Sequence, residues 1–99
     1  MVRFKFNDEL VAPHVELIAS LGIRRNYLDE AQMNKIHELL KIEEKSIEEL
    51  RAVRNSVVKL FSDKEDEQIS YAEADRYHYA MNGVLVLIDS RIWDLGGNV

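Results

Sequence analysis

The sequence predicts an all-α fold: a small three- or four-helix bundle with one long central helix. Apolar residues recur at spacings of three and four over residues 30–61 and again over residues 71–94, which is the period of a helix with one buried face. Residue pairs typical of helix N-termini precede both stretches. Since 46% of the 99 residues are hydrophobic, we expect a single helical domain over residues 1–99 with one small core.

A short first helix is expected to end near Leu21. Asn7 or Asp8 can cap its first turn by accepting a hydrogen bond from an unpaired backbone N–H. Pro13 suits the start of a helix better than its middle, because proline has no N–H to donate. Gly22 follows Leu21 and can take the left-handed conformation that ends many helices.

A long second helix is predicted over residues 30–61. Asp29 and Gln32 match a capping box, in which each side chain bonds the backbone N–H of the other residue. An apolar stripe marks the face that we expect to pack on the rest of the bundle. Its members are Met33, Ile36, Leu40, Ile47, Leu50, Val57 and Phe61.

The stretch KIEEKSIEEL, residues 41–50, decides whether this second helix is continuous. The stripe keeps its phase across the stretch, because Leu40 and Ile47 lie seven residues apart. That continuity favours one helix, or two collinear pieces, over a sharp joint. Ser46 and Glu49 form another capping-box pair, so the same stretch also holds a latent helix start or a bend.

A last helix is predicted over residues 71–94. The polar residues 62–70 before it are typical of a loop, and Ser70 with Glu73 matches a capping box at the helix start. Gly96 can end the helix. Because the joining loop is short, we expect the second and last helices to pack antiparallel.

The main competing prediction rests on Asn82 and Gly83, the dipeptide most typical of a β-hairpin turn. In that alternative, an α+β fold with a C-terminal hairpin, residues 76–81 pair with residues 84–88, and the alternating residues 2–6 add a third strand. We prefer the helix, since the periodic stretch is long and starts with a capping signal.

Composition and charge limit the classes of function. The formal net charge is −5 at pH 7, so the chain repels phosphates and we expect no direct binding to nucleic acid. There are no cysteines, which removes disulfides and thiolate metal sites. Because we find neither a long apolar run nor a basic-then-apolar leader, we expect a cytoplasmic protein that binds no membrane.

Several carboxylates are candidates for metal chemistry. In a continuous helix, Glu44 and Glu48 lie one turn apart on one face and can hold magnesium, with Glu73 and Asp75 as further ligands. That arrangement gives the least favoured hypothesis, a magnesium-dependent nucleotide hydrolase. A solvated helix face explains the glutamates more simply. We therefore expect that the protein is not an enzyme and holds neither a metal nor another cofactor.

Two charged residues, Glu43 and Arg54, fall at positions of the central stripe where apolar residues are expected. One interpretation is that the stripe drifts past them, as it does along a straight helix. The other is that they set the register or the partner choice of a helix–helix contact.

The preferred function is that of a non-enzymatic regulator, inhibitor or immunity-type protein that binds another protein through a helix surface. Five apolar residues at or beyond the main stripes form the predicted contact patch: Leu39, Ile42, Val58, Leu87 and Trp93. The alternative is that they complete the core of the chain. The expected partner is another protein, and a homodimer is one form that the partnership can take.

Acidic residues near the end of the second helix give the other class of function. Side chains there can imitate the phosphates of a nucleic acid toward a basic pocket of a DNA- or RNA-handling protein. In that class the residues that imitate phosphates are Asp63, Glu65, Asp66, Glu67, Glu73 and Asp75, and the first four are the predicted protein-binding residues.

Overall fold

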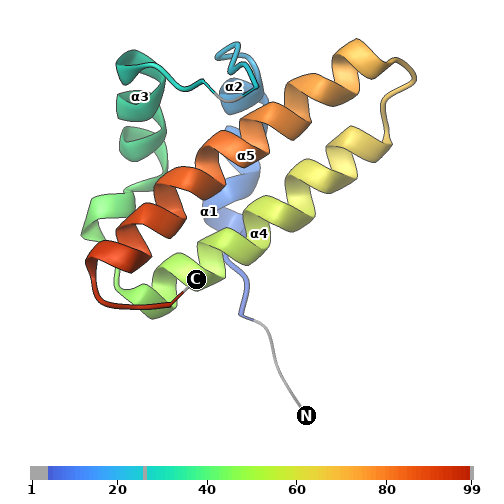
Figure 1. Cartoon of the computed structure of the whole chain (residues 1–99). Coiled ribbons are helices and arrows are strands. Elements are labelled where there is room, and N and C mark those ends of the chain that lie inside the picture. The colour runs from blue at the N-terminus through green and yellow to red at the C-terminus, as the bar shows by residue number, and fades with distance from the viewer. Residues whose placement is uncertain (1–4, 26, 99) are drawn as a thin grey trace.

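Figure 1 shows the computed structural model, which describes residues 5–25 and 27–98. Within them the chain folds into four helices, the first of them bent, and no strand is present, so the predicted all-α class is confirmed. The Cα radius of gyration is 13.0 Å, close to the ~13 Å expected of a compact chain of this length. The elements are α1 (Asp8–Val11), the 3-10 turn η1 (Ala12–His14), α2 (Val15–Ala19), α3 (Glu30–Leu40), the 3-10 turn η2 (Ile42–Glu44), α4 (Ile47–Asp66) and α5 (Tyr71–Asp94).

Helices α4 and α5 form the antiparallel pair on which the other elements pack (Figure 1). The predicted last helix has the same bounds as α5, whereas α4 continues to Asp66 and leaves a loop of only residues 67–70. Ser70 caps α5, because its hydroxyl accepts a hydrogen bond from the N–H of Glu73 at 3.3 Å. The largest fully buried side chains come from every helix and include Ile18, Ile36, Leu40, Leu50, Phe61 and Ile88.

The predicted long helix over residues 30–61 is wrong at residues 41–46, where the chain turns between two separate helices. Helix α3 ends at Leu40, and Lys41 takes the left-handed conformation with a φ of 52°. The η2 turn follows before α4 begins at Ile47. The two helices are not collinear, because α3 stands across the α4–α5 pair (Figure 1).

Capping and burial explain this break. The capping box at Ser46 is complete: the N–H of Glu49 donates to Ser46 Oγ at 3.2 Å, and the N–H of Ser46 donates to Glu49 Oε1 at 3.0 Å. Ile42 in the η2 turn is fully buried, so the turn adds an apolar side chain to the core. The shared phase of Leu40 and Ile47 therefore reflects two differently directed helices that face one core.

The first helix is bent at its only proline. Pro13 lies near the start of the η1 turn between α1 and α2, a position that tolerates a residue without a backbone N–H. Asn7 caps the helix by accepting a backbone N–H one turn further on. The helix ends at Ala19, close to the predicted end at Leu21, and Gly22 follows with a φ of 72°.

The predicted hairpin alternative is wrong, because Asn82 and Gly83 lie inside α5. Gly83 serves a close helix–loop contact instead of a turn: a Cβ at this position would lie 3.3 Å from Ile23 and 3.4 Å from Leu28. Of the third strand predicted over residues 2–6, residues 2–4 lie outside the described residues, and the other two are not in a strand.

Candidate functional site

A groove runs between the α2–α3 connection, of which residues 20–25 and 27–29 are described, and the outward face of α5. Its volume is about 880 Å³, and we refer to it as the α5 groove. The lining residues that the structure describes are Ile23, Arg24, Arg25, Tyr27, Leu28, Met33, Glu65, Asp75, His78, Tyr79, Asn82, Gly83, Val86 and Leu87. Clefts of this size with a few convergent polar groups are typical of binding sites.

The floor of the groove exists because the α2–α3 connection is fixed to the helices on both sides. Ile23 is buried where it meets the bare backbone of Gly83. The carbonyl of Leu21 accepts a hydrogen bond from Gln32 Nε2 at 2.9 Å, and Gln32 also completes the capping box with Asp29. The predicted Asp29–Gln32 capping box is therefore confirmed and also positions one wall of the groove.

Charged side chains of both signs line the α5 groove. Arg24 and Arg25 are exposed on the loop wall, and neither forms an ion pair with another described residue. On the helix side, Glu65 Oε2 lies 3.4 Å from His78 Nδ1, and Asn82 Nδ2 lies 3.3 Å from His78 Nε2. The groove therefore presents a basic loop wall, unpaired among the described residues, opposite a helix wall that carries two acids, Glu65 and Asp75.

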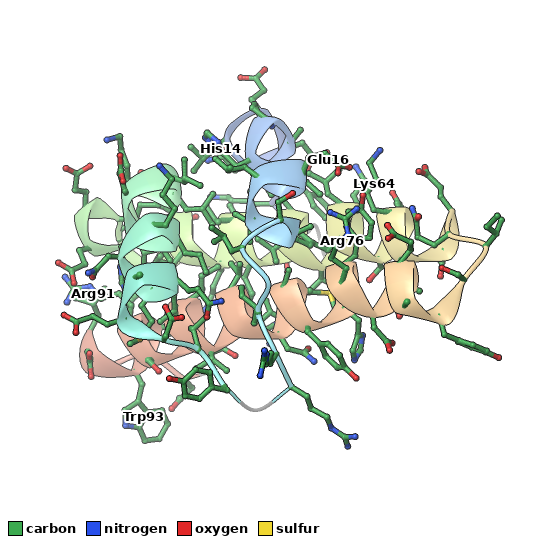
Figure 2. The ribbon with its side chains drawn as sticks, turned by 90° about the horizontal axis from the view of Figure 1, so that it is seen from above. His14, Glu16, Lys64, Arg76, Arg91 and Trp93 are labelled. Atoms are coloured by element: carbon green, nitrogen blue, oxygen red, sulfur yellow. The ribbon has the colours of Figure 1, made fainter. Side chains whose placement is uncertain are left out.

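An exposed apolar stripe on α5 extends the groove along the helix. Tyr79, Val86 and Trp93 are spaced by seven residues and thus lie on one face, which we name the α5 outer stripe. The first two line the groove, and the side chains of Val86 and Trp93 are 59% and 68% exposed. Figure 2 shows Trp93 projecting away from the fold near the C-terminal end of α5.

The predicted apolar patch is broken up in the structure. Trp93 is exposed as expected, but Ile42 is fully buried, Leu87 is 8% exposed and Leu39 packs against the core. These three residues complete the core, so their predicted place on a contact surface is corrected. Val58 is exposed, but it lies in a shallow depression beside Phe6 and is not part of the α5 groove.

Val86 is the residue of the α5 outer stripe that is clearly exposed and that the predicted contact patch omits. It lies inside the apolar run 84–88, which has the composition of a segment buried on all sides. The available signal is its spacing of seven residues from Trp93, which places the two side chains on one face of α5.

The predicted acidic residues lie at the end of α4 and the start of α5, and only Glu65 and Asp75 share a pocket, the α5 groove. Asp63, Asp66 and Glu67 are exposed, whereas Glu65 is half-buried in the α5 groove. Lys64 lies among them, with its Nζ 3.7 Å from Glu67 Oε2. The nearby cation reduces the likeness of this surface to a run of nucleic-acid phosphates.

Of the two residues predicted to set helix register, only Arg54 lies between helices. Its guanidinium donates to both carboxylate oxygens of Asp89 on α5, at 2.7 Å and 3.3 Å, and the pair is half-buried. Glu43 is exposed in the η2 turn, where only its backbone carbonyl accepts a hydrogen bond, from Arg91. Its predicted place in a helix seam is wrong because the helix ends before it.

The break at residues 41–46 also removes the geometric premise of the magnesium hypothesis. Glu44 lies in the η2 turn and Glu48 in the first turn of α4, where it pairs with Lys5, so the two glutamates are not one turn apart on a single helix. Across residues 5–25 and 27–98, no three histidine, aspartate or glutamate side chains gather in a way that could hold a metal ion.

Two polar clusters outside the groove connect the first helix to the α4–α5 pair. The hydroxyl of Tyr77 donates to the carboxylate of Glu16, with oxygen–oxygen distances of 2.8 Å and 2.9 Å, and accepts from Arg76 at 3.2 Å. Figure 2 shows Glu16, Lys64 and Arg76 gathered beside α2. Burial raises the pKa of the Tyr77 hydroxyl, and the hydrogen bond to Glu16 raises it further.

The second cluster holds the start of α1 on α4. Ser56 is fully buried, and its hydroxyl donates to Asp8 Oδ1 at 2.7 Å and accepts from the N–H of Asn7 at 2.6 Å. Lys59 donates to Asp8 Oδ2 at 2.8 Å, and this hydrogen bond lowers the pKa of the Asp8 carboxyl. Since these polar groups bond one another, the cluster acts as a structural attachment.

Comparisons with known proteins identify no relative of this chain. No family model, no curated protein and no solved structure matches it. None of the described helices has the length and apolar character needed to cross a membrane.

Proposed function

We propose that the protein is a non-enzymatic binding module, a regulator or inhibitor that recognises a protein partner through the outward face of α5. The observation that carries the proposal is the α5 outer stripe, in which Val86 and Trp93 are exposed directly beside the α5 groove. The partner is expected in the cytoplasm, in keeping with the sequence prediction.

The composition of this face supports a protein contact. Tyrosine, tryptophan and arginine are enriched at the energetic centres of protein interfaces, and Tyr79, Trp93, Arg24 and Arg25 lie in or beside the groove. Groups of large exposed apolar side chains commonly mark an interaction site. The side of α5 that faces α4 is buried, so only its outward face is open to a partner.

Capture by the immobilised full-length chain from extracts of the native host, with substituted chains alongside, tests the proposal. We expect Trp93→Ala and Val86→Asp to lose the partner, because truncation of a central interface tryptophan costs about 2 kcal/mol or more of binding free energy. Tyr71→Ala is the matched control, since Tyr71 is a 91% exposed aromatic residue on the same helix but outside the groove.

The captured protein is then purified and titrated by calorimetry against the four chains. Equal affinity for the wild-type and Trp93→Ala chains, with circular dichroism showing both folded, would contradict the proposal. Loss of binding in Tyr71→Ala but not in Val86→Asp would place the contact elsewhere on the molecule.

A further inference from the structure

We infer that the occupant of the α5 outward face is a second copy of this chain, packed antiparallel, with Trp93 and Asp94 of each copy seated in the α5 groove of the other. The inference deepens the proposed function, because it names the partner of the same surface. It rests on the spacing of the exposed residues along α5 and on the charges at the two contact points.

The spacing along α5 is symmetric about Val86. Tyr79, at the groove, and Trp93, the projecting side chain, are each seven residues from Val86, which is ~10 Å along a helix. A two-fold axis through Val86 therefore brings Trp93 of one copy opposite Tyr79 of the other. Two-fold interfaces use the same patch on both subunits, so a projection and a groove at equal distances from the axis satisfy both contacts at once.

The charges at these contact points are complementary. Asp94 directly follows Trp93, is exposed and forms no ion pair with another described residue. The loop wall of the groove carries Arg24 and Arg25, which are likewise exposed and unpaired among the described residues, whereas the acids of the groove, Glu65 and Asp75, lie on its helix side. When Trp93 enters the groove of the partner copy, the carboxylate of Asp94 arrives beside these two guanidinium groups, and opposite charges across an interface favour that register.

The net charge of −5 does not oppose this arrangement, because most of the excess acid lies away from the axis. Among the acids of residues 63–73, Asp66 ends α4 and Glu67 lies in the loop between α4 and α5, whereas Glu65 lies beside His78 of α5. In the antiparallel pair the two acidic ends point in opposite directions. Even at the level of His78, eight residues from Val86, the acids of the two copies are separated by ~24 Å along the helices, and salt screens charges beyond ~10 Å.

Sedimentation velocity of the full-length chain from micromolar to millimolar concentrations tests the inference. We expect a monomer–dimer equilibrium, a dissociation constant raised at least about tenfold by Trp93→Ala, and no change in Tyr71→Ala. Circular dichroism of each variant verifies that it is folded. A wild-type chain that stays monomeric throughout, or a Trp93→Ala chain that dimerises as tightly as the wild type, overturns the inference.

Charge exchange tests the antiparallel register independently. Asp94→Arg alone, and Arg24→Glu with Arg25→Glu, should each weaken the dimer by about two- to fivefold, as expected of exposed ion pairs. A chain carrying all three changes should regain part of the lost affinity, because the opposite charges again face each other. A triple variant weaker than both parents contradicts the register.

The outcome for the inference is separable from the outcome for the proposed function. A monomeric chain that still binds a different host protein, with loss in Trp93→Ala and Val86→Asp, overturns the dimer and leaves the proposed function standing. A Trp93-dependent dimer supports both.

Discussion

The hydroxyl group of Tyr77 connects α2 to α5. Its side chain is 4% exposed, and the hydroxyl donates to Glu16 while accepting from Arg76. Burial is the main reason that its pKa lies above the ordinary value, because a buried phenolate would lose its hydration, and the hydrogen bond to the Glu16 carboxylate and its negative charge raise the pKa further. The residue therefore favours the folded state only while it is protonated.

Alkaline unfolding should reveal this contribution. Because the folded-state pKa of Tyr77 is raised, its contribution to stability is complete below the ordinary tyrosine pKa of ~10 and is lost as pH rises through the folded value. Tyr77→Phe should cost about 1 kcal/mol at neutral pH for the lost hydrogen bonds. The difference in unfolding free energy between the two chains should shrink above the ordinary pKa. If urea titrations give the same difference in unfolding free energy below and above this pKa, the hydroxyl of Tyr77 does not stabilise the fold in the way described.

Single residues also show what periodicity can and cannot predict. Trp93 is recognisable from the sequence as a large apolar residue beyond the main stripe. Ile42 is buried although the sequence predicts it in the contact patch, and Val86 is exposed although the predicted patch omits it, because burial depends on where a helix ends and on what packs against it. Both errors come from contacts between segments distant in sequence, which no local pattern contains.

At the level of elements, the best-predicted features of the chain are the start of α3 and both ends of α5. The capping box before α3 forms as expected, Ser70 caps α5, and Gly96 takes a φ of 88° just after the end of α5. Within residues 41–50, the capping box at Ser46 proves a better guide than the phase of the apolar stripe. The stripe cannot distinguish one helix from two, because two helices that face the same core can share a phase by chance.

Substitution of Lys41 tests the break between α3 and α4. The left-handed conformation of Lys41 costs roughly 1–2 kcal/mol of stability. Glycine adopts this conformation without most of that cost, although it loses more backbone entropy on folding. Lys41→Gly should therefore stabilise the fold by about 0.5–1 kcal/mol. In a continuous helix the same glycine would destabilise it by about 1 kcal/mol. Urea unfolding followed by far-ultraviolet circular dichroism distinguishes the two signs.

Ser46→Ala serves as the companion variant for the same break. Loss of the cap at the start of α4 should cost about 1 kcal/mol, because the N–H of Glu49 loses its acceptor. If residues 30–61 formed one continuous helix, Ser46→Ala would instead increase stability, since alanine has a higher helix propensity than serine. A stabilised Ser46→Ala chain would therefore contradict the structure.

At the level of the whole molecule, the candidate site arises from segments that are far apart in the sequence. The α2–α3 connection crosses α5 at Gly83, about sixty residues further along the chain, and this crossing forms the α5 groove. The sequence identifies the antiparallel α4–α5 pair, which follows from a short loop and two amphipathic helices. The groove is not predictable in the same way, because Gly83 has the local signature of a hairpin turn and acquires its packing role only in the folded chain.

Trp93 gives the most direct test of self-association through the α5 outer stripe, since the chain contains one tryptophan. Its side chain is 68% exposed in the single chain, and association through the α5 outer stripe would bury it. As the protein concentration rises from micromolar to millimolar, the fluorescence emission should move to shorter wavelength and quenching by iodide should fall. The Asp94→Arg chain should show the same change only at higher concentration. If the emission maximum and the iodide quenching stay constant over the whole concentration range, the chain does not self-associate through Trp93.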